Sequence, residues 1–217
     1  MIDGVIIQRS NCVKYLGVYV DEKLKWTDHI NYVRSNIIKF TGIFYKIRNK
    51  LSSINLRQLY FATVYPHIMY CIEIYGNTHK TYLNDLIIIN NKILRILQYK
   101  DIRTNIAELY NDFNTFQINV LFEIQLLLLV YKFVNNLQSL PSALHNLFNI
   151  NVNVHKFNTR LKDGLHIEMK NSSFGRHCIG FVAAKLYNQL PLNIKCSSSL
   201  TEFKNKICNM YRISSLL

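Results

Sequence analysis

Apolar residues recur every three or four positions over three long stretches of the chain, the spacing typical of amphipathic helices. We expect these helices over about 27–51, 54–75 and 81–98. Pro66 lies inside the second stretch and predicts a kink or a boundary there, because its ring clashes with a continuous helix. Since the connections between the stretches are short, the pattern predicts an antiparallel helical bundle.

The helix ends carry recognisable capping residues. Thr27 or Asp28 is expected to cap the first helix, and Ser52 or Ser53 the second, by accepting free backbone N–H groups. Gly76 is expected to end the second helix in the left-handed conformation. This second stretch is also unusually aromatic, and its rings either belong to the core or stack on nucleic-acid bases; they are Tyr60, Phe61, Tyr65, Tyr70 and Tyr75.

Two more helices follow, a short one over about 105–111 and a long one over about 116–136. The long one is apolar on nearly all sides, which predicts burial between other elements. Its most apolar run, 126–130, is too short to span a bilayer. We therefore expect a buried core helix and no membrane partner.

The N-terminal part shows the short-range alternation of β structure. We expect one strand over 13–21, with Val18 and Val20 on one face and Gly17 on the other, paired in a hairpin with a strand over 5–7. A glycine inside a strand often marks the close approach of another backbone or of a ligand.

The predicted fold is mainly α, with three regions. They are a β-hairpin over 1–25, a helical bundle over 26–140, and a smaller α+β part over 141–217 that begins where Leu140-Pro141 breaks the chain. In the last region we expect a strand over 155–160 and a helix whose capping box joins Ser199 and Glu202.

The charge balance adds a further feature. The 217 residues include 26 Lys and Arg but only 13 Asp and Glu, which gives a net charge of +13. From His29 to Ile72 there is no acidic residue, but there are six cations. A solvated helix face normally mixes both signs, so we interpret this segment as a surface that faces phosphates. The alternative interpretation is an ordinary solvated face.

Other chemistry leaves few traces. The five cysteines are odd in number and widely spaced, with no Cys-x-x-Cys pair, which predicts reduced thiols in an intracellular compartment, nuclear or cytoplasmic. The first residues do not have the pattern of a signal peptide. There is no phosphate-binding glycine loop, no Ser-His-Asp order and no His-Glu-x-x-His motif, and we expect no small-molecule substrate.

Several short motifs together resemble one family. Lys14-Tyr15-Leu16-Gly17-Val18, Asp21, Trp26 and His29-Ile30 are similar to the segment that follows the catalytic palm in reverse transcriptases of jockey-like non-LTR retrotransposons. The resemblance continues through later blocks, with Tyr75 where the family has tryptophan; they are Leu59-Tyr60, Pro66-His67, Tyr75-Gly76-Asn77, Ser173-Phe174-Gly175-Arg176 and Ala183 to Pro191.

The resemblance implies that the strand with Gly17 ends the palm near the primer, and that the helices after it form the thumb. In this family the carboxylates that hold two Mg²⁺ ions lie upstream and include an aspartate pair. No Asp-Asp pair occurs in this chain. We therefore expect the chain alone to be inactive, with no cofactor of its own and Mg²⁺ only together with the missing palm.

The predicted function is that of a C-terminal fragment of an RNA-directed DNA polymerase, whose thumb-like clamp binds an RNA–DNA or RNA template–primer duplex through phosphates. Its other partners would be the missing polymerase domains. The alternative is a stand-alone helical module that binds nucleic acid or another protein. The candidate nucleic-acid contacts are Lys14, Tyr15, Gly17, Arg34, Lys39, Lys46, Arg48, Lys50, Arg160 and Arg176.

Overall fold

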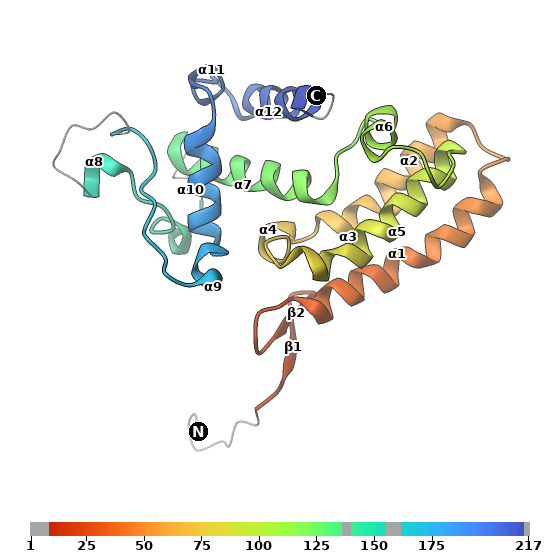
Figure 1. Ribbon diagram of the computed structural model, residues 1–217, viewed down its shortest axis with the longest axis horizontal. Coiled ribbons are helices and arrows are strands. Elements are labelled where there is room, and N and C mark those ends of the chain that lie inside the picture. The colour runs from red at the N-terminus through yellow and green to blue at the C-terminus, as the bar shows by residue number, and fades with distance from the viewer. Residues whose placement is uncertain (1–8, 136–139, 155–161, 215–217) are drawn as a thin grey trace. The chain divides into compact units, whose positions relative to one another are not determined.

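The computed structural model describes residues 9–135, 140–154 and 162–214 (Figure 1). These residues are mainly helical and carry one short antiparallel sheet near the N-terminus, which confirms the predicted fold class. The chain forms two compact units. The first unit comprises Met1–Cys71 and Thr78–Thr115, and the second comprises Ile72–Asn77 and Phe116–Leu217.

The sheet is a hairpin of β1 (Cys12–Tyr15) and β2 (Val18–Asp21). The prediction of one strand over 13–21 is wrong, because Leu16 and Gly17 form a two-residue turn with φ of 44° and 83°. Positive φ at both central residues gives a turn whose twist matches the flanking strands. The expected partner strand over 5–7 lies outside the described residues.

Asp21 organises the junction between the hairpin and helix α1 (Thr27–Ile47). Its buried carboxylate accepts the backbone N–H groups of Lys23, Lys25 and Trp26 at 3.1, 3.0 and 2.6 Å. The predicted cap by Thr27 or Asp28 is therefore wrong, since the residue before the helix is Trp26 in the left-handed conformation, with no side-chain cap. The carboxylate of Asp21, five positions before Trp26, accepts the backbone N–H groups of this turn instead.

Helix α1 buries the predicted apolar stripe and ends at Ile47, four residues before the expected end. Its fully buried apolar side chains are Ile30, Val33, Ile37 and Phe44. The second predicted helix is divided into α2 (Ser53–Thr63), α3 (Tyr65–Met69) and α4 (Ile72–Tyr75).

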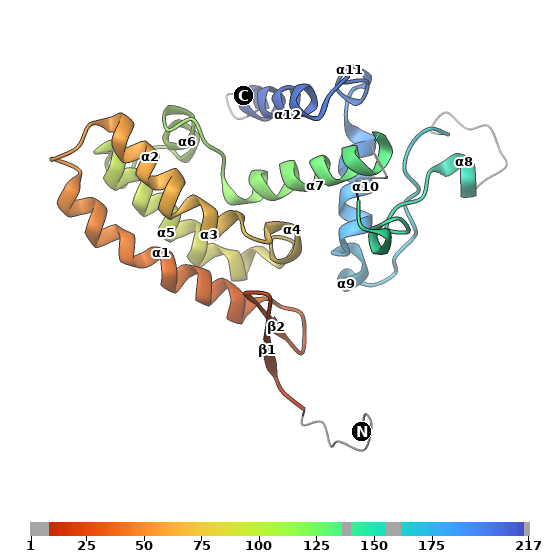
Figure 2. The same cartoon turned by 180° about the vertical axis from the view of Figure 1, so that it is seen from behind.

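Pro66 lies in the first turn of α3, where its missing N–H needs no partner, so the predicted boundary is confirmed. The predicted cap by Ser52 is also confirmed, because its hydroxyl accepts the N–H of Asn55. Helix α2 runs antiparallel to α1 and to α5 (Lys80–Gln98), and α5 lies along α1 (Figures 1 and 2).

A buried polar network joins α2, α5 and α6 (Ile106–Asp112). The Tyr60 hydroxyl donates to Asn90 Oδ1 at 2.9 Å, and the Asn90 amide donates to the Tyr110 hydroxyl at 3.0 Å. Tyr110 in turn donates to Asn91 Oδ1 at 2.7 Å. Burial raises the pKa of both tyrosines, so they stay neutral donors. The ring of Tyr60 thus belongs to the core, whereas that of Tyr70 is half exposed.

Replacing Tyr60 by Phe is expected to lower the free energy of unfolding by about 1–2 kcal/mol, because it leaves the buried Asn90 Oδ1 without its donor. Urea unfolding measures this change. The exposed Tyr15 provides the matched control, and its replacement by Phe is expected to have no effect. Equal stability of the two variants would contradict the role given to the network.

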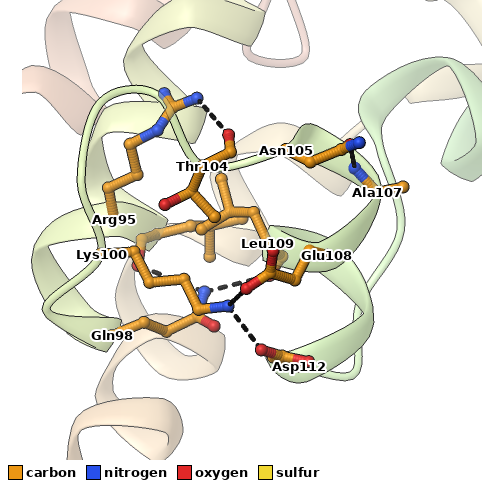
Figure 3. A network of polar contacts seen from close by, with 10 residues as sticks. Arg95, Gln98, Lys100, Thr104, Asn105, Ala107, Glu108, Leu109 and Asp112 are labelled. Atoms are coloured by element: carbon orange, nitrogen blue, oxygen red, sulfur yellow. Dashed lines mark hydrogen bonds and ion pairs between the residues drawn. The ribbon is translucent and has the colours of Figure 1, made fainter.

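The loop after α5 is held to α6 by several polar contacts (Figure 3). Lys100 Nζ lies 2.5 Å from Glu108 Oε1 and 2.5 Å from Asp112 Oδ2. Both hydrogen bonds raise the pKa of Lys100, and the one to Asp112 has the larger effect. Arg95 donates to the Thr104 carbonyl at 3.5 Å. Both cations therefore have partners within the first unit.

The second unit is arranged around α7 (Ile118–Asn135), which packs on α4, α10 (Ile179–Gln189) and α12 (Leu200–Ser214). The break predicted at 140–141 lies inside this unit, because the apolar α7 packs on helices from its C-terminal part. The smaller elements are η2 (Ser142–Leu144), α8 (Asn151–Val154), α9 (Ser173–Arg176), α11 (Leu192–Lys195) and the bridge between Ile150 and Leu165.

Helix α7 is the one described helix with the length and apolar composition to cross a membrane, and half of it is buried inside the molecule. Its packing is that of a core helix. The strand expected over 155–160 lies outside the described residues. At the start of α12, the Ser199 hydroxyl accepts the N–H of Glu202, as predicted. The Glu202 carboxylate accepts from the N–H and the hydroxyl of Ser198, one residue before the position that a capping box uses.

Gly76 does not form the predicted left-handed cap, since Gly17 is the one glycine with positive φ in the described part of the chain. Gly76 is instead tightly packed. A Cβ atom there would lie 2.6 Å from the Ile72 carbonyl oxygen and 2.7 Å from Phe122 Cδ2. The glycine is thus required by space and not by backbone conformation.

Candidate nucleic-acid interface

Lys14 is held over two aromatic rings at the hairpin. Its Nζ lies 5.3 Å from the ring centroid of Tyr19 and 5.2 Å from that of Tyr32. The negative faces of the rings attract the ammonium group, which fixes the position of this exposed cation. The two rings are themselves 5.1 Å apart, so strand β2 and helix α1 both contribute to the site.

His29, buried on α1, connects this helix to strand β2. It is 1% exposed, and its Nδ1 lies 3.5 Å from the backbone N–H of Tyr19. Burial lowers the pKa of His29, so the neutral imidazole accepts this hydrogen bond. His29 therefore supports the hairpin on α1 and does not supply a charge.

The hairpin turn contacts Tyr70, which follows α3. The Tyr70 hydroxyl donates to the Leu16 carbonyl at 2.5 Å, and a Cβ at Gly17 would lie 3.4 Å from Tyr70 Cε1. The close approach expected at Gly17 is thus made by a side chain of this chain. Tyr15 lies beside the turn with 68% of its side chain exposed.

The structure places Lys39 and Lys46 on the same exposed side of α1, away from Arg34 and Arg48. Since an α-helix turns by about 100° per residue, the two lysines lie within about 20° of each other on α1. Both are exposed, on the side opposite the buried stripe. Arg34 and Arg48 are half-buried and lie at the edge of that stripe. Lys50 is exposed in the turn after α1.

Arg48 lies between two tyrosine rings. Its guanidinium carbon is 4.4 Å from the ring centroid of Tyr45 and 4.9 Å from that of Tyr99. The Tyr99 hydroxyl donates to the Arg48 carbonyl at 2.5 Å, and its oxygen lies 2.9 Å from the side-chain amide oxygen of Asn49. We call Tyr45, Arg48 and Tyr99 the tyrosine–arginine cluster. Sequence reasoning missed both tyrosines; the spacing of three residues could have indicated Tyr45, but nothing local indicates Tyr99.

The remaining predicted contacts belong to the C-terminal part of the chain. Arg176 is exposed in the second unit, and its Nε donates to the Lys170 carbonyl at 3.2 Å. Arg160 lies outside the described residues. Among the residues that the structure describes, no three His, Cys, Asp or Glu side chains gather in a way that could hold a metal ion.

Comparison with known proteins points to mobile elements. The chain is 34% identical over 98 residues to the RNA-directed DNA polymerase from mobile element jockey of Drosophila funebris, and 30% identical over 98 residues to that of Drosophila melanogaster. It is 27% identical over 99 residues to a protein named as a probable RNA-directed DNA polymerase from transposon X-element of Drosophila melanogaster.

Part of this chain is homologous to non-LTR retrotransposon reverse transcriptases. This result confirms the resemblance seen in the sequence for the part of the chain that the matches cover. The matches to the jockey polymerases cover 43% of the chain, and the chain spans about 11% of the length of these relatives. No family model matches the chain, and no solved structure matches it.

Proposed function

We propose that this chain is part of a non-LTR retrotransposon RNA-directed DNA polymerase, and that its first unit is a thumb-like clamp that binds the template–primer duplex through phosphates. The observation that carries the proposal is the pair Lys39 and Lys46. Both lysines are exposed on one side of α1, inside a run from His29 to Ile72 that contains six cations and no acid.

The geometry of this pair suits a nucleic-acid strand. Seven helical residues rise by about 10 Å, and a duplex advances about 3.4 Å per nucleotide along each strand, so the two ammonium groups span about three nucleotides. Such contacts neutralise phosphates without reading the sequence. Gly42 lies between the two lysines, and the space beside it is open, since an added Cβ would meet nothing within 4 Å.

The proposal gives the chain a holding role. Lys14 adds a third exposed cation to the first unit, and this one is held over the rings of Tyr19 and Tyr32 at the hairpin. The proposal assigns no catalytic residue to this chain, and it assigns the Mg²⁺-dependent chemistry to the remainder of the polymerase.

A salt titration tests the proposal. Binding of a fluorescent RNA–DNA hybrid to the chain is measured by anisotropy between 50 and 200 mM KCl. Two or three phosphate contacts predict a slope of about −2 to −3 for log affinity against log salt, and equal affinity for hybrids of different sequence. A hybrid that does not bind, or an affinity that does not change with salt, would overturn the proposal and favour a protein-interaction module.

A further inference from the structure

The tyrosine–arginine cluster exposes two aromatic rings where α1 and α5 end. The side chain of Tyr45 is 60% exposed and that of Tyr99 is 57% exposed, although each ring has Arg48 on one side. Rings that served only to cover an arginine would be expected to turn more of their surface inward. The cluster therefore leaves open aromatic surface next to a cation.

The position of Tyr99 is fixed by several constraints. It caps α5 with φ of 56°, a left-handed conformation that costs free energy for a residue with a side chain. Its hydroxyl donates to the Arg48 carbonyl just after the end of α1 and lies next to Asn49. Strained residues that the surroundings hold in place gather at ligand-binding sites. The ring of Tyr99 is thus fixed before any ligand arrives, and it contacts the Arg48 guanidinium against which the ring of Tyr45 lies.

The exposed residues that flank Arg48 in the chain include two cations. Lys46 and Lys50 are exposed on either side of Arg48 along the chain. The nearest carboxylate in sequence to Tyr99 is that of Asp101, which accepts the backbone N–H of Arg103 and so serves its own turn. Aromatic faces with cations beside them are the composition of surfaces that bind single-stranded nucleic acid, because bases stack on the rings while phosphates meet the cations.

We propose that the tyrosine–arginine cluster binds an unpaired base of a single-stranded segment that adjoins the duplex. The base stacks on the open face of Tyr45, and Lys50 contacts a neighbouring phosphate, while Lys46 stays on the duplex. Any base presents a flat face to the ring, so the site selects for the presence of a base and not for its identity. This inference rests on the proposed function, since it requires that the first unit binds nucleic acid.

Two substrates of equal charge separate stacking from phosphate binding. One is an RNA–DNA hybrid with a single-stranded overhang of ordinary nucleotides, and the other carries the same overhang with abasic sugars. We expect the full chain to bind the first about 10-fold more tightly than the second. Tyr45→Ala is expected to abolish this preference, whereas Tyr45→Phe keeps the ring and is expected to retain it. Neither change is expected to alter the slope of log affinity against log salt concentration.

The outcomes distinguish this inference from the proposed function. Salt-dependent binding of the hybrid with no preference for the base-bearing overhang would overturn the stacking site alone. Retention of the preference by Tyr45→Ala would also overturn the stacking site. So would an equal loss of affinity of Tyr45→Ala for both substrates, because that result would assign Tyr45 to the duplex contact. Absence of all binding would overturn both. Circular dichroism of the variants shows whether the exposed Tyr45 can be replaced without loss of fold.

Discussion

Charge reversal of Lys39 and Lys46 together is expected to weaken binding of an RNA–DNA hybrid by about 100-fold at 100 mM salt. Each phosphate contact contributes a slope of about 0.9, which corresponds to about 8-fold in affinity between 1 M and 0.1 M salt. Two lost contacts account for about 60-fold, and the repulsion of phosphates by two glutamates adds to it. The measurement is a salt titration of Lys39→Glu/Lys46→Glu, whose slope should fall by about 2.

The matched control carries the same change in net charge elsewhere. Lys92 on α5 and Lys204 on α12 are both exposed, and the variant Lys92→Glu/Lys204→Glu is expected to change the affinity only a few-fold. If both variants weaken binding equally, the attraction comes from the overall charge of +13 and not from the pair on α1.

Replacing Gly76 by Ala is expected to lower the free energy of unfolding of the second unit by about 3 kcal/mol, at the upper end of the cost of overpacking. The new Cβ would lie 2.6 Å from the Ile72 carbonyl oxygen, which belongs to the backbone and cannot turn aside. It would also lie 2.7 Å from Phe122, whose ring is packed in α7. Urea unfolding followed by circular dichroism measures the loss.

Gly42 gives the control for this prediction, because a Cβ atom added there would meet nothing within 4 Å. Gly42→Ala is expected to leave stability unchanged or to raise it by up to about 1 kcal/mol, since alanine is the better helix former. A loss in Gly42→Ala equal to that in Gly76→Ala would show that close packing is not the cause.

Local signals in the sequence predicted most of the helices. The apolar stripe of α1, the break at Pro66 and the cap at Ser52 each depend on residues within one or two turns of each other, and the structure has all three. The helix expected over 116–136 also matches α7 (Ile118–Asn135) closely. These features follow from periodicity and from the covalent chemistry of single residues.

The errors arose where distant residues decide the conformation. Alternation continues through Leu16 and Gly17, so the turn resembles a strand until the pairing of Tyr15 with Val18 is known. Gly76 resembles a helix cap until Phe122 is placed beside it. For the same reason the candidate site was predicted only in part.

The cations of α1 were visible in the sequence, but their division between two sides of the helix depends on which side is buried. Lys39 and Lys46 share the solvent-exposed side, whereas Arg48 contacts Tyr99, 51 positions away along the chain. A count of charges gave the sign of the surface, and only the packing showed which charges remain accessible.

Helix α4 has a practical consequence for anyone who wishes to dissect this protein. Its residues come from the middle of the first unit's sequence, yet Ile72 and Tyr75 are fully buried and α4 packs on α7. A truncation that starts at residue 116 would remove those two side chains and expose the apolar surface that they cover. No single cut therefore yields two intact halves, and a separately expressed C-terminal piece would need α4 grafted back or supplied as a peptide.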